Sequence, residues 1–235
     1  MILPRLRPRL TIREVESAED PGFKAAHTLL TRTFPRRELL SRGEWADVMR
    51  ERNAGLWTDL NWHLLVAIRR DRVVGTASGS YVGNRNAGMV GYIAVLPAER
   101  GHGVGQRLRR ALHEAFEADA RRVHGRRLTA IIGEVRPDNP WLRHIVRHNG
   151  AIALDFPYHQ PPVAWLRRAV PLVLYYQPLG RERRSLRASE VRQLVYTIWR
   201  RVYRVGKPLS SKVFRRMMGA LSGRKRVGQL ELSAR

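Results

Sequence analysis

Apolar and polar residues follow one another along this chain with two different periods. Short apolar runs and alternating stretches, typical of β-strands, occupy residues 10–15, 64–68, 73–78, 89–95, 128–135, 151–156 and 170–177. Apolar residues spaced three and four apart, typical of helices, occupy residues 23–53, 106–123 and 140–149, with breaks in the first at Pro35 and at 41–43. Asp71-Arg72 predicts a tight turn that makes 64–68 and 73–78 a hairpin. The order predicts the α/β (α+β) class, with a sheet flanked by helices.

The same pattern divides the chain into three parts. Residues 1–9 are basic and rich in proline and predict a flexible arm. Residues 10–180 carry the alternating strands and helices, and Gly180 ends this compact domain. Residues 181–235 form a basic extension, in which the spacing predicts a helix over 189–202, capped by Ser189, and a second helix over 210–221.

Composition narrows the functional classes. The chain has 235 residues, 43% of them hydrophobic, which is enough for a packed core and argues against disorder. It contains no cysteine, so disulfides, cysteine-bound zinc and a covalent thioester on the protein are excluded. We find neither a run of about 20 apolar residues nor a secretory signal, and therefore expect a cytoplasmic protein.

The excess of basic residues indicates anionic partners but does not identify which kind. The net charge is +24, from 44 Lys and Arg against 20 Asp and Glu, and the extension 181–235 alone holds 16 basic and three acidic residues. Nucleic acid, anionic lipid and a polyphosphate cofactor all fit this balance, as do arginines spread over solvated faces. The extension leaves the same choice open: a helix packed on the domain, or a basic amphipathic element whose Trp199 and Tyr203 meet an anionic surface. An oligomer contact or a cover over a bound apolar group is also open.

The turn between the strand at 89–95 and the helix that follows carries the most specific chemistry. Gly101, Gly103 and Gly105 leave the backbone uncovered where a helix begins, so that its N–H groups and dipole can face a diphosphate. Arg100 adds a positive charge at the rim. The spacing fits neither the dinucleotide fingerprint nor a P-loop, which requires Gly-Lys-Ser/Thr.

Arg100, Gly103 and Gly105 resemble the R/Q-x-x-G-x-G/A motif of the GNAT acetyltransferases. The segment 93–99 is similar to that family's fourth strand and its exit, and Asn139 stands eleven residues before Gly150, as in the family's second signature. The order of strands and helices also resembles the family's. The resemblance implies a GNAT fold, with a mixed, mostly antiparallel sheet of six to seven strands, followed here by a helical C-terminal extension.

The resemblance also implies a cosubstrate and its contacts. Acetyl-CoA or another acyl-CoA would bind, with the backbone of Ile93, Ala94 and Val95 facing the pantetheine arm. Arg100 and the backbone of Gly101, His102, Gly103, Val104 and Gly105 would hold the pyrophosphate, and Asn139 would contact the pantetheine. Purely structural roles remain open: a core strand at 93–95 and a helix cap at Asn139. No metal is expected.

Acyl transfer to an amine requires a group that accepts a proton. Glu134 is our candidate for this catalytic base, because a carboxylate at the end of an apolar strand is unusual and burial raises its pKa. A pairing with an arginine such as Arg136 is the alternative, and Tyr92 is a weaker candidate. The family often supplies the acid toward the thiolate from a tyrosine at the position of Val146, so here that acid would be water or another residue.

The expected function is transfer of an acetyl or other acyl group from acyl-CoA directly to an amine of a small molecule or peptide. In this fold Tyr158 and Gln160, on the loop 155–162, would border the acceptor, and Tyr92 is the third candidate for binding it. The positive charge favours a neutral or anionic acceptor over a polyamine. Two alternatives stay open: an acyl-CoA-binding GNAT fold with little turnover, and a membrane- or nucleic-acid-associated protein acting through 181–235. The sequence does not distinguish a monomer from a homodimer.

Overall fold

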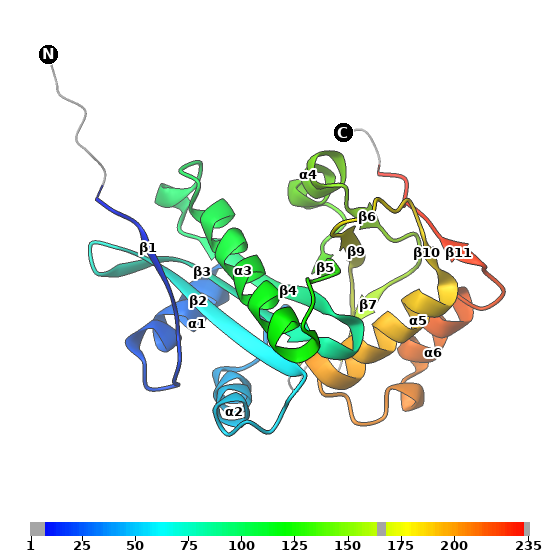
Figure 1. Cartoon of the computed structure of the whole chain (residues 1–235), viewed down its shortest axis with the longest axis horizontal. Helices are drawn as coiled ribbons and strands as arrows, with labels where there is room; N and C mark the ends of the chain where they lie inside the picture. The colour runs from blue at the N-terminus through cyan, green and yellow to red at the C-terminus, as the bar shows by residue number, and fades with distance from the viewer. Residues whose placement is uncertain (1–7, 164–167, 233–235) are drawn as a thin grey trace, which may run out of the picture.

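The computed structural model describes residues 8–163 and 168–232 (Figure 1). Residues 1–7 of the predicted basic arm lie outside the described residues. The strands are β1 (Thr11–Glu14), β2 (Leu60–Arg69), β3 (Arg72–Val82), β4 (Ala87–Val95), β5 (Ala130–Val135), β6 (Ile152–Ala153), β7 (His159–Gln160), β8 (Val170–Pro171), β9 (Val173–Pro178), β10 (Leu186–Arg187) and β11 (Arg226–Val227). The helices are α1 (Pro21–Thr33), α2 (Arg42–Asn53), α3 (Val104–His124), α4 (Pro140–Asn149), α5 (Ala188–Thr197) and α6 (Lys212–Ala220).

Seven strands form the main sheet, in the order β1-β2-β3-β4-β5-β9-β6. The neighbours β4 and β5 run parallel, whereas the other neighbouring pairs run antiparallel. The predicted mixed, mostly antiparallel sheet flanked by helices is therefore confirmed. The hairpin between β2 and β3 turns at Arg70 and Asp71, which both have positive φ, one residue earlier than the sequence suggested.

The strand predicted over 151–156 is shorter than expected. β6 covers Ile152–Ala153, and β9 lies between it and β5. The backbone N–H of Ala153 donates to the side chain of Gln229, and Leu154 pairs with Gln229 in an isolated bridge. The C-terminal segment therefore lies along the edge of β6 that faces away from β9.

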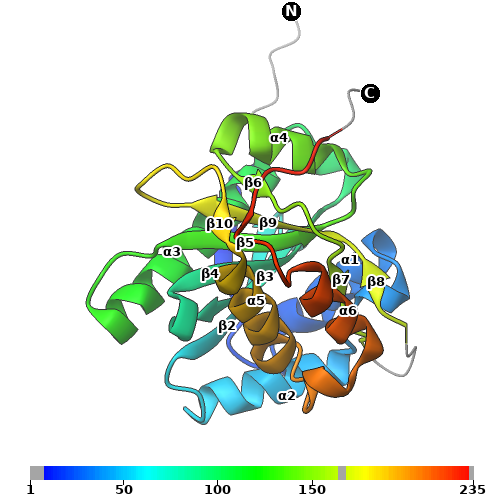
Figure 2. The ribbon, with the colours of Figure 1, turned by 90° about the vertical axis from the view of Figure 1, so that its right-hand side faces the viewer.

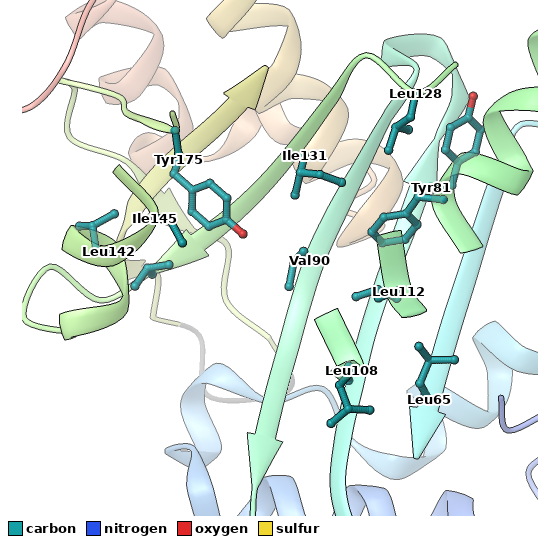
Figure 3. Packing of buried hydrophobic residues seen from close by; sticks show 14 of the residues in the cluster. Leu65, Tyr81, Val90, Leu108, Leu112, Leu128, Ile131, Leu142, Ile145 and Tyr175 are labelled. Atoms are coloured by element: carbon teal, nitrogen blue, oxygen red, sulfur yellow. The ribbon is translucent and has the colours of Figure 1, made fainter. Parts of the chain in front are cut away.

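Helices cover both faces of the sheet. On one face, α3 and α4 pack on the strands, and Figure 3 shows Leu108 and Leu112 of α3 beside Leu65 and Val90 of the sheet. On the opposite face, α1 and α2 cover one half of the sheet and α5 and α6 cover the other. Figure 2 shows α3 and α1 on opposite sides of the strands.

Residues beyond Gly180 are part of the core. The predicted apolar face of α5 is buried, and with α6 it packs against Val82, Met89 and Ile132 of the sheet. The helix begins at Ala188 rather than at the predicted cap Ser189, and the carboxylate of Glu190 accepts the backbone N–H of Arg187 instead. After Thr197 the helix widens into a π-helical turn over Ile198–Val202.

The parallel strands β4 and β5 separate toward their C-terminal ends. They pair from Ala87 and Ala130 to Val90 and Gly133. Beyond that point β4 remains paired with β3, after a bulge in which Gly91 has no partner. β5 remains paired with β9. The sheet is therefore open between residues 91–95 of β4 and 134–135 of β5, and this opening organises the site.

A buried ionic cluster joins β1, β2 and α3 under the other end of the sheet. The ring nitrogens Nδ1 and Nε2 of His63 lie 2.9 Å and 2.8 Å from carboxylate oxygens of Glu14 and Asp119. Burial opposes the charged imidazole, but the hydrogen bonds and charges of the two carboxylates outweigh it and raise the pKa of His63 to about 9.

This cluster predicts a pH-dependent stability. Because the folded pKa of His63 lies above its unfolded value of about 6.5, its contribution is complete below about pH 6.5 and is lost as pH rises through about 9. We expect the free energy of unfolding of the wild type to fall by about 3 kcal/mol more than that of His63→Gln between pH 6 and pH 10, measured by denaturant titration. Parallel pH profiles of the two proteins, or a midpoint near 6.5 for the His63 ring by NMR, would contradict this.

Candidate active site

The glycine turn after β4 presents bare backbone at the start of α3. Gly101 and Gly103 have φ of +77° and +73°, a region that side chains rarely adopt, and α3 begins directly after them at Val104. A Cβ added at either glycine would have no atom within 4 Å, and no side chain caps the helix. The first N–H groups of α3 therefore face an exposed, uncovered turn, as an anion site requires.

Arg100 connects this turn to the open strand. Its Nε donates to the carbonyl oxygen of Val95 at 3.3 Å, and its side chain is exposed. Ile93 and Val95 pack their side chains toward the α3 and α4 face, while Ala94 is buried under α1 and α2. The backbone edge of these residues that faces β5 is not paired with β5, so polar backbone groups are free to meet a ligand in the opening.

Asn139 is the N-cap of α4. Its Oδ1 accepts the backbone N–H of Trp141 at 3.0 Å, which is the structural role that the sequence left open. α4 ends at Gly150, which has a φ of +63°. A contact of Asn139 with a cosubstrate stays a prediction.

Glu134 lies on β5 directly after the last residue pair with β4. Its side chain is on the α5 and α6 face, and its two carboxylate oxygens accept hydrogen bonds from the hydroxyls of Tyr158 and Tyr203. Burial raises the pKa of Glu134 to about 7, although both tyrosine hydrogen bonds lower it. The alternative, a pairing with Arg136, is absent from the described contacts of Glu134, and Arg136 instead contacts Glu38 and Asp138.

The three predicted acceptor residues form two hydrogen-bonded groups, Tyr158 with Glu134, and Tyr92 and Gln160 with Glu38. Tyr158 and Gln160 are both buried. The hydroxyl of Tyr92 and the amide of Gln160 donate to the same backbone carbonyl, that of Glu38, at 2.5 Å and 3.4 Å. Burial raises the pKa of Tyr92 above its usual value, so its hydroxyl stays protonated. The structure thus brings Glu134, Tyr158, Tyr92 and Gln160 to one end of the β4–β5 opening.

Sequence reasoning missed Tyr203 as a site residue. One of the two alternatives left open placed Tyr203 and Trp199 at an anionic surface, but Trp199 is buried and donates from Nε1 to the carbonyl of His159 at 3.1 Å. The neighbouring Arg201 and Arg204 form ion pairs with Asp59 and Glu51. Nothing in the spacing of the extension indicates that it returns to β5, so no local signal could have found Tyr203.

Comparison with known proteins decides the family. The model of the Acetyltransferase (GNAT) family matches residues 23–148, more than half of the chain. The chain belongs to this family. No sequence among the curated proteins matches this GNAT chain at a significant level. The described residues contain no helix long and apolar enough to cross a membrane.

Solved structures share the GNAT fold at low identity. A GNAT-family structure from Bacteroides thetaiotaomicron is 19% identical, covers 83% of this chain and 99% of its own, and has a TM-score of 0.59. The ribosomal-protein-S18-alanine N-acetyltransferase of Escherichia coli is 18% identical, with coverages of 74% and 97% and a TM-score of 0.51. Ard1 from Thermoplasma volcanium is 17% identical, with coverages of 73% and 99% and a TM-score of 0.51.

Proposed function

We propose that this GNAT protein is an N-acyltransferase that transfers an acetyl or other acyl group from acyl-CoA directly to an amine. The observation that carries the proposal is Glu134, a carboxylate with a pKa of about 7 at the point where β4 and β5 separate. A base with this pKa is half ionised at neutral pH, which suits it to accept a proton from an ammonium group. Membership of an acetyltransferase family supports the same reaction.

The residues at the glycine turn fit the cosubstrate. The uncapped N-terminus of α3 and the side-chain-free space at Gly101 and Gly103 suit a diphosphate, and Arg100 supplies a positive charge. His102, Val104 and Gly105 would add backbone groups, Ile93 to Val95 would line the pantetheine arm, and Asn139 would lie at its far side. When bound, acyl-CoA supplies the activated acyl carbon.

This chain's own residues would manage the protons. An ammonium group would lose one proton toward Glu134, and the neutral nitrogen would then form a bond to the acyl carbon as the carbon–sulfur bond breaks. The nitrogen would lose its second proton to water as the amide forms. The departing sulfur takes the electron pair and a proton. Val146, which packs against the α3 and α4 core, offers no hydroxyl for that proton. Tyr158 and Tyr203 are the hydroxyls held at Glu134, and we propose that one of them or a water replaces the missing acid.

The deciding experiment measures thiol release from acetyl-CoA by the purified protein with a panel of amines. We expect turnover with at least one amine and a preference for neutral or anionic acceptors over polyamines. Tight binding of acetyl-CoA without turnover of any amine would favour a CoA-binding protein with little activity, the alternative that Val146 supports. No binding of any CoA ester would contradict the proposal. We also expect a cytoplasmic location and either a monomer or a homodimer, and neither expectation depends on this experiment.

Removal of the Tyr203 hydroxyl should change the pKa of Glu134. Its hydrogen bond lowers the pKa of Glu134, so Tyr203→Phe should shift the midpoint of the pH profile of kcat/KM upward from about 7 and reduce kcat at pH 7. Tyr196→Phe removes a hydroxyl from an exposed position on the preceding helix α5 and serves as the matched control. An unchanged midpoint in Tyr203→Phe would assign Tyr203 a purely structural role.

A further inference from the structure

The longest stretch of the chain without an acidic residue covers one half of one face of the sheet. Residues 191–230 contain eleven Lys and Arg and no Asp or Glu. The apolar sides of α5 and α6, from Val191 to Ile198 and from Phe214 to Leu221, are buried against the strands. The basic side chains of the two helices occupy the exposed positions between them, so they point away from the core.

Three of the eleven cations attach the extension to the domain. Each forms an ion pair with a carboxylate that precedes the extension in the sequence: Arg201 with Asp59, Arg204 with Glu51, and Arg224 with Asp155. Docking therefore explains part of the positive charge. It does not explain the cations on the outer side of α5 and α6.

Six of the remaining cations form one exposed surface, which we call the basic face. It consists of Arg192 from α5, Arg200 from the π-helical turn, Lys207 from the connection, and Lys212, Arg215 and Arg216 from α6. Within the described residues none of the six forms an ion pair with a carboxylate. The two helices lie side by side (Figures 1 and 2), and the ring of Phe214 on α6 packs 5.1 Å from that of Trp199, centroid to centroid. The six charges therefore belong to one continuous surface.

The basic face is unfavourable for the isolated protein. Lys212 is the first residue of α6, where the helix dipole opposes a cation. Arg216 follows it at i+4, and like charges at this spacing destabilise a helix. Because a polyanion would remove this repulsion, the face is suited to binding one.

The packing of the two helices indicates which polyanion fits. A helix that binds a membrane surface inserts an apolar side among the lipids, but here the apolar sides of α5 and α6 are already buried. The face offers guanidinium and ammonium groups, which are the usual partners of nucleic-acid phosphates. The side-chain carbonyl of Gln193, on the outer side of α5, already accepts a hydrogen bond from Arg85 at 2.8 Å, so it does not serve to read a base edge.

We propose that the basic face binds double-stranded RNA through the phosphate backbone. The wide, shallow minor groove of an A-form duplex brings the phosphates on both of its sides within reach of two adjacent helices. The grooves of B-form DNA are read by an element inserted into them, whereas α5 and α6 are packed along their length on the sheet. The proposal does not depend on acyl transfer, because the hydrogen bonds to the carboxylate of Glu134 come from tyrosines outside the basic face.

The test measures binding of a labelled RNA duplex of about 20 base pairs by fluorescence anisotropy, between about 50 and 200 mM salt. The variant replaces four cations of the basic face: Arg192→Gln, Arg200→Gln, Lys212→Gln and Arg216→Gln. Each lost phosphate contact should make the slope of log affinity against log salt shallower by about 0.9, which gives about 3 to 4 for the four changes. At about 100 mM salt the affinity should fall at least about 30-fold.

The matched control removes the same charge over the other half of this face of the sheet. It changes four exposed cations of α1, the turn after it and α2: Lys24→Gln, Arg32→Gln, Arg36→Gln and Arg42→Gln. Arg42 begins α2 as Lys212 begins α6, so both variants remove a cation from the start of a helix. The control should keep the wild-type slope and lose less than about threefold in affinity, because salt screens charges that do not contact the RNA.

The outcomes distinguish the basic face from net charge and RNA from other polyanions. Equal losses in the two variants would overturn the proposal, because net charge alone would then attract the RNA. A DNA duplex of the same sequence that binds as tightly would overturn the choice of RNA, and so would vesicles containing phosphatidylserine whose binding, unlike that of RNA, is lost in the face variant. Absence of saturable RNA binding to the wild type would also overturn it. Melting curves check that each variant folds; if the fourfold variant does not, the α5 pair and the α6 pair tested separately should each give half of the change in slope.

Discussion

Replacing Glu134 by glutamine is expected to lower kcat by about 100-fold or more while leaving the affinity for acetyl-CoA unchanged. Glutamine keeps the size of the side chain and can accept one of the two tyrosine hydrogen bonds through its carbonyl, while its amide N–H faces the other tyrosine oxygen, but it cannot take a proton. The loss should therefore appear in the chemical step and not in binding. The rate of thiol release at saturating substrate gives kcat, and calorimetry on the same preparation gives the affinity for acetyl-CoA.

The pH profile makes this prediction sharper. The wild-type kcat/KM should rise with pH through a midpoint of about 7, because burial raises the pKa of Glu134 and only the ionised carboxylate accepts a proton. That limb should vanish in Glu134→Gln. Glu117→Gln is the matched control. The carboxylate of Glu117 accepts the backbone N–H of Leu128 and lies toward the far end of α3, so this variant should retain full activity. A Glu134→Gln protein with wild-type kcat would exclude Glu134 as the base.

Gly103→Glu should abolish measurable acetyl-CoA binding, a loss of at least about 100-fold. Two effects combine at this position: a left-handed φ of +73° costs a side-chain-bearing residue about 1–2 kcal/mol, and a carboxylate would stand where the diphosphate is expected. Calorimetric titration with acetyl-CoA measures the result directly. If the variant bound as tightly as the wild type, the turn would not be the cosubstrate site.

The opposite end of the same helix provides the control. Gly125 follows α3 with a φ of +63°, and a Cβ there would also meet no atom within 4 Å. Gly125→Glu therefore introduces the same side chain with similar backbone strain, and an unfavourable charge at the helix C-terminus, far along α3 from the turn. It should lower the melting temperature by at least as much as Gly103→Glu does but bind acetyl-CoA normally. Equal loss of binding in both variants would show that destabilisation alone explains the effect.

The sequence was sufficient for features that local physics determines. Helix breaks at Pro35, at the loop before α2 and at Gly125 and Gly150 follow from proline and glycine conformational preferences, and the structure places the ends of the helices accordingly. The position of Glu134 at the end of β5 also followed from its apolar surroundings. The contact of β6 with Gln229 did not, because it joins residues more than seventy positions apart.

The hydrogen bonds between the tyrosines and Glu134 could not be predicted from the sequence. Tyr158 could be placed near the acceptor by analogy with the fold, but its hydrogen bond to Glu134 joins residues 24 positions apart. Tyr203 lies 69 positions from Glu134 and reaches it through the packing of α5 on the sheet. Amphipathic spacing predicts which face of α5 is apolar, but it does not state which surface that face will cover.

The packing of α5 and α6 on the sheet also sets the order in which the protein can fold during synthesis. Val82, Met89 and Ile132 are buried against side chains as late as Met217 and Leu221. Contacts across such sequence separations form slowly, and here they cannot form until the ribosome has released most of the chain. The half of the core that carries Glu134 is therefore completed last, and its apolar strands stay exposed to chaperones and to aggregation for longer than those beneath α3.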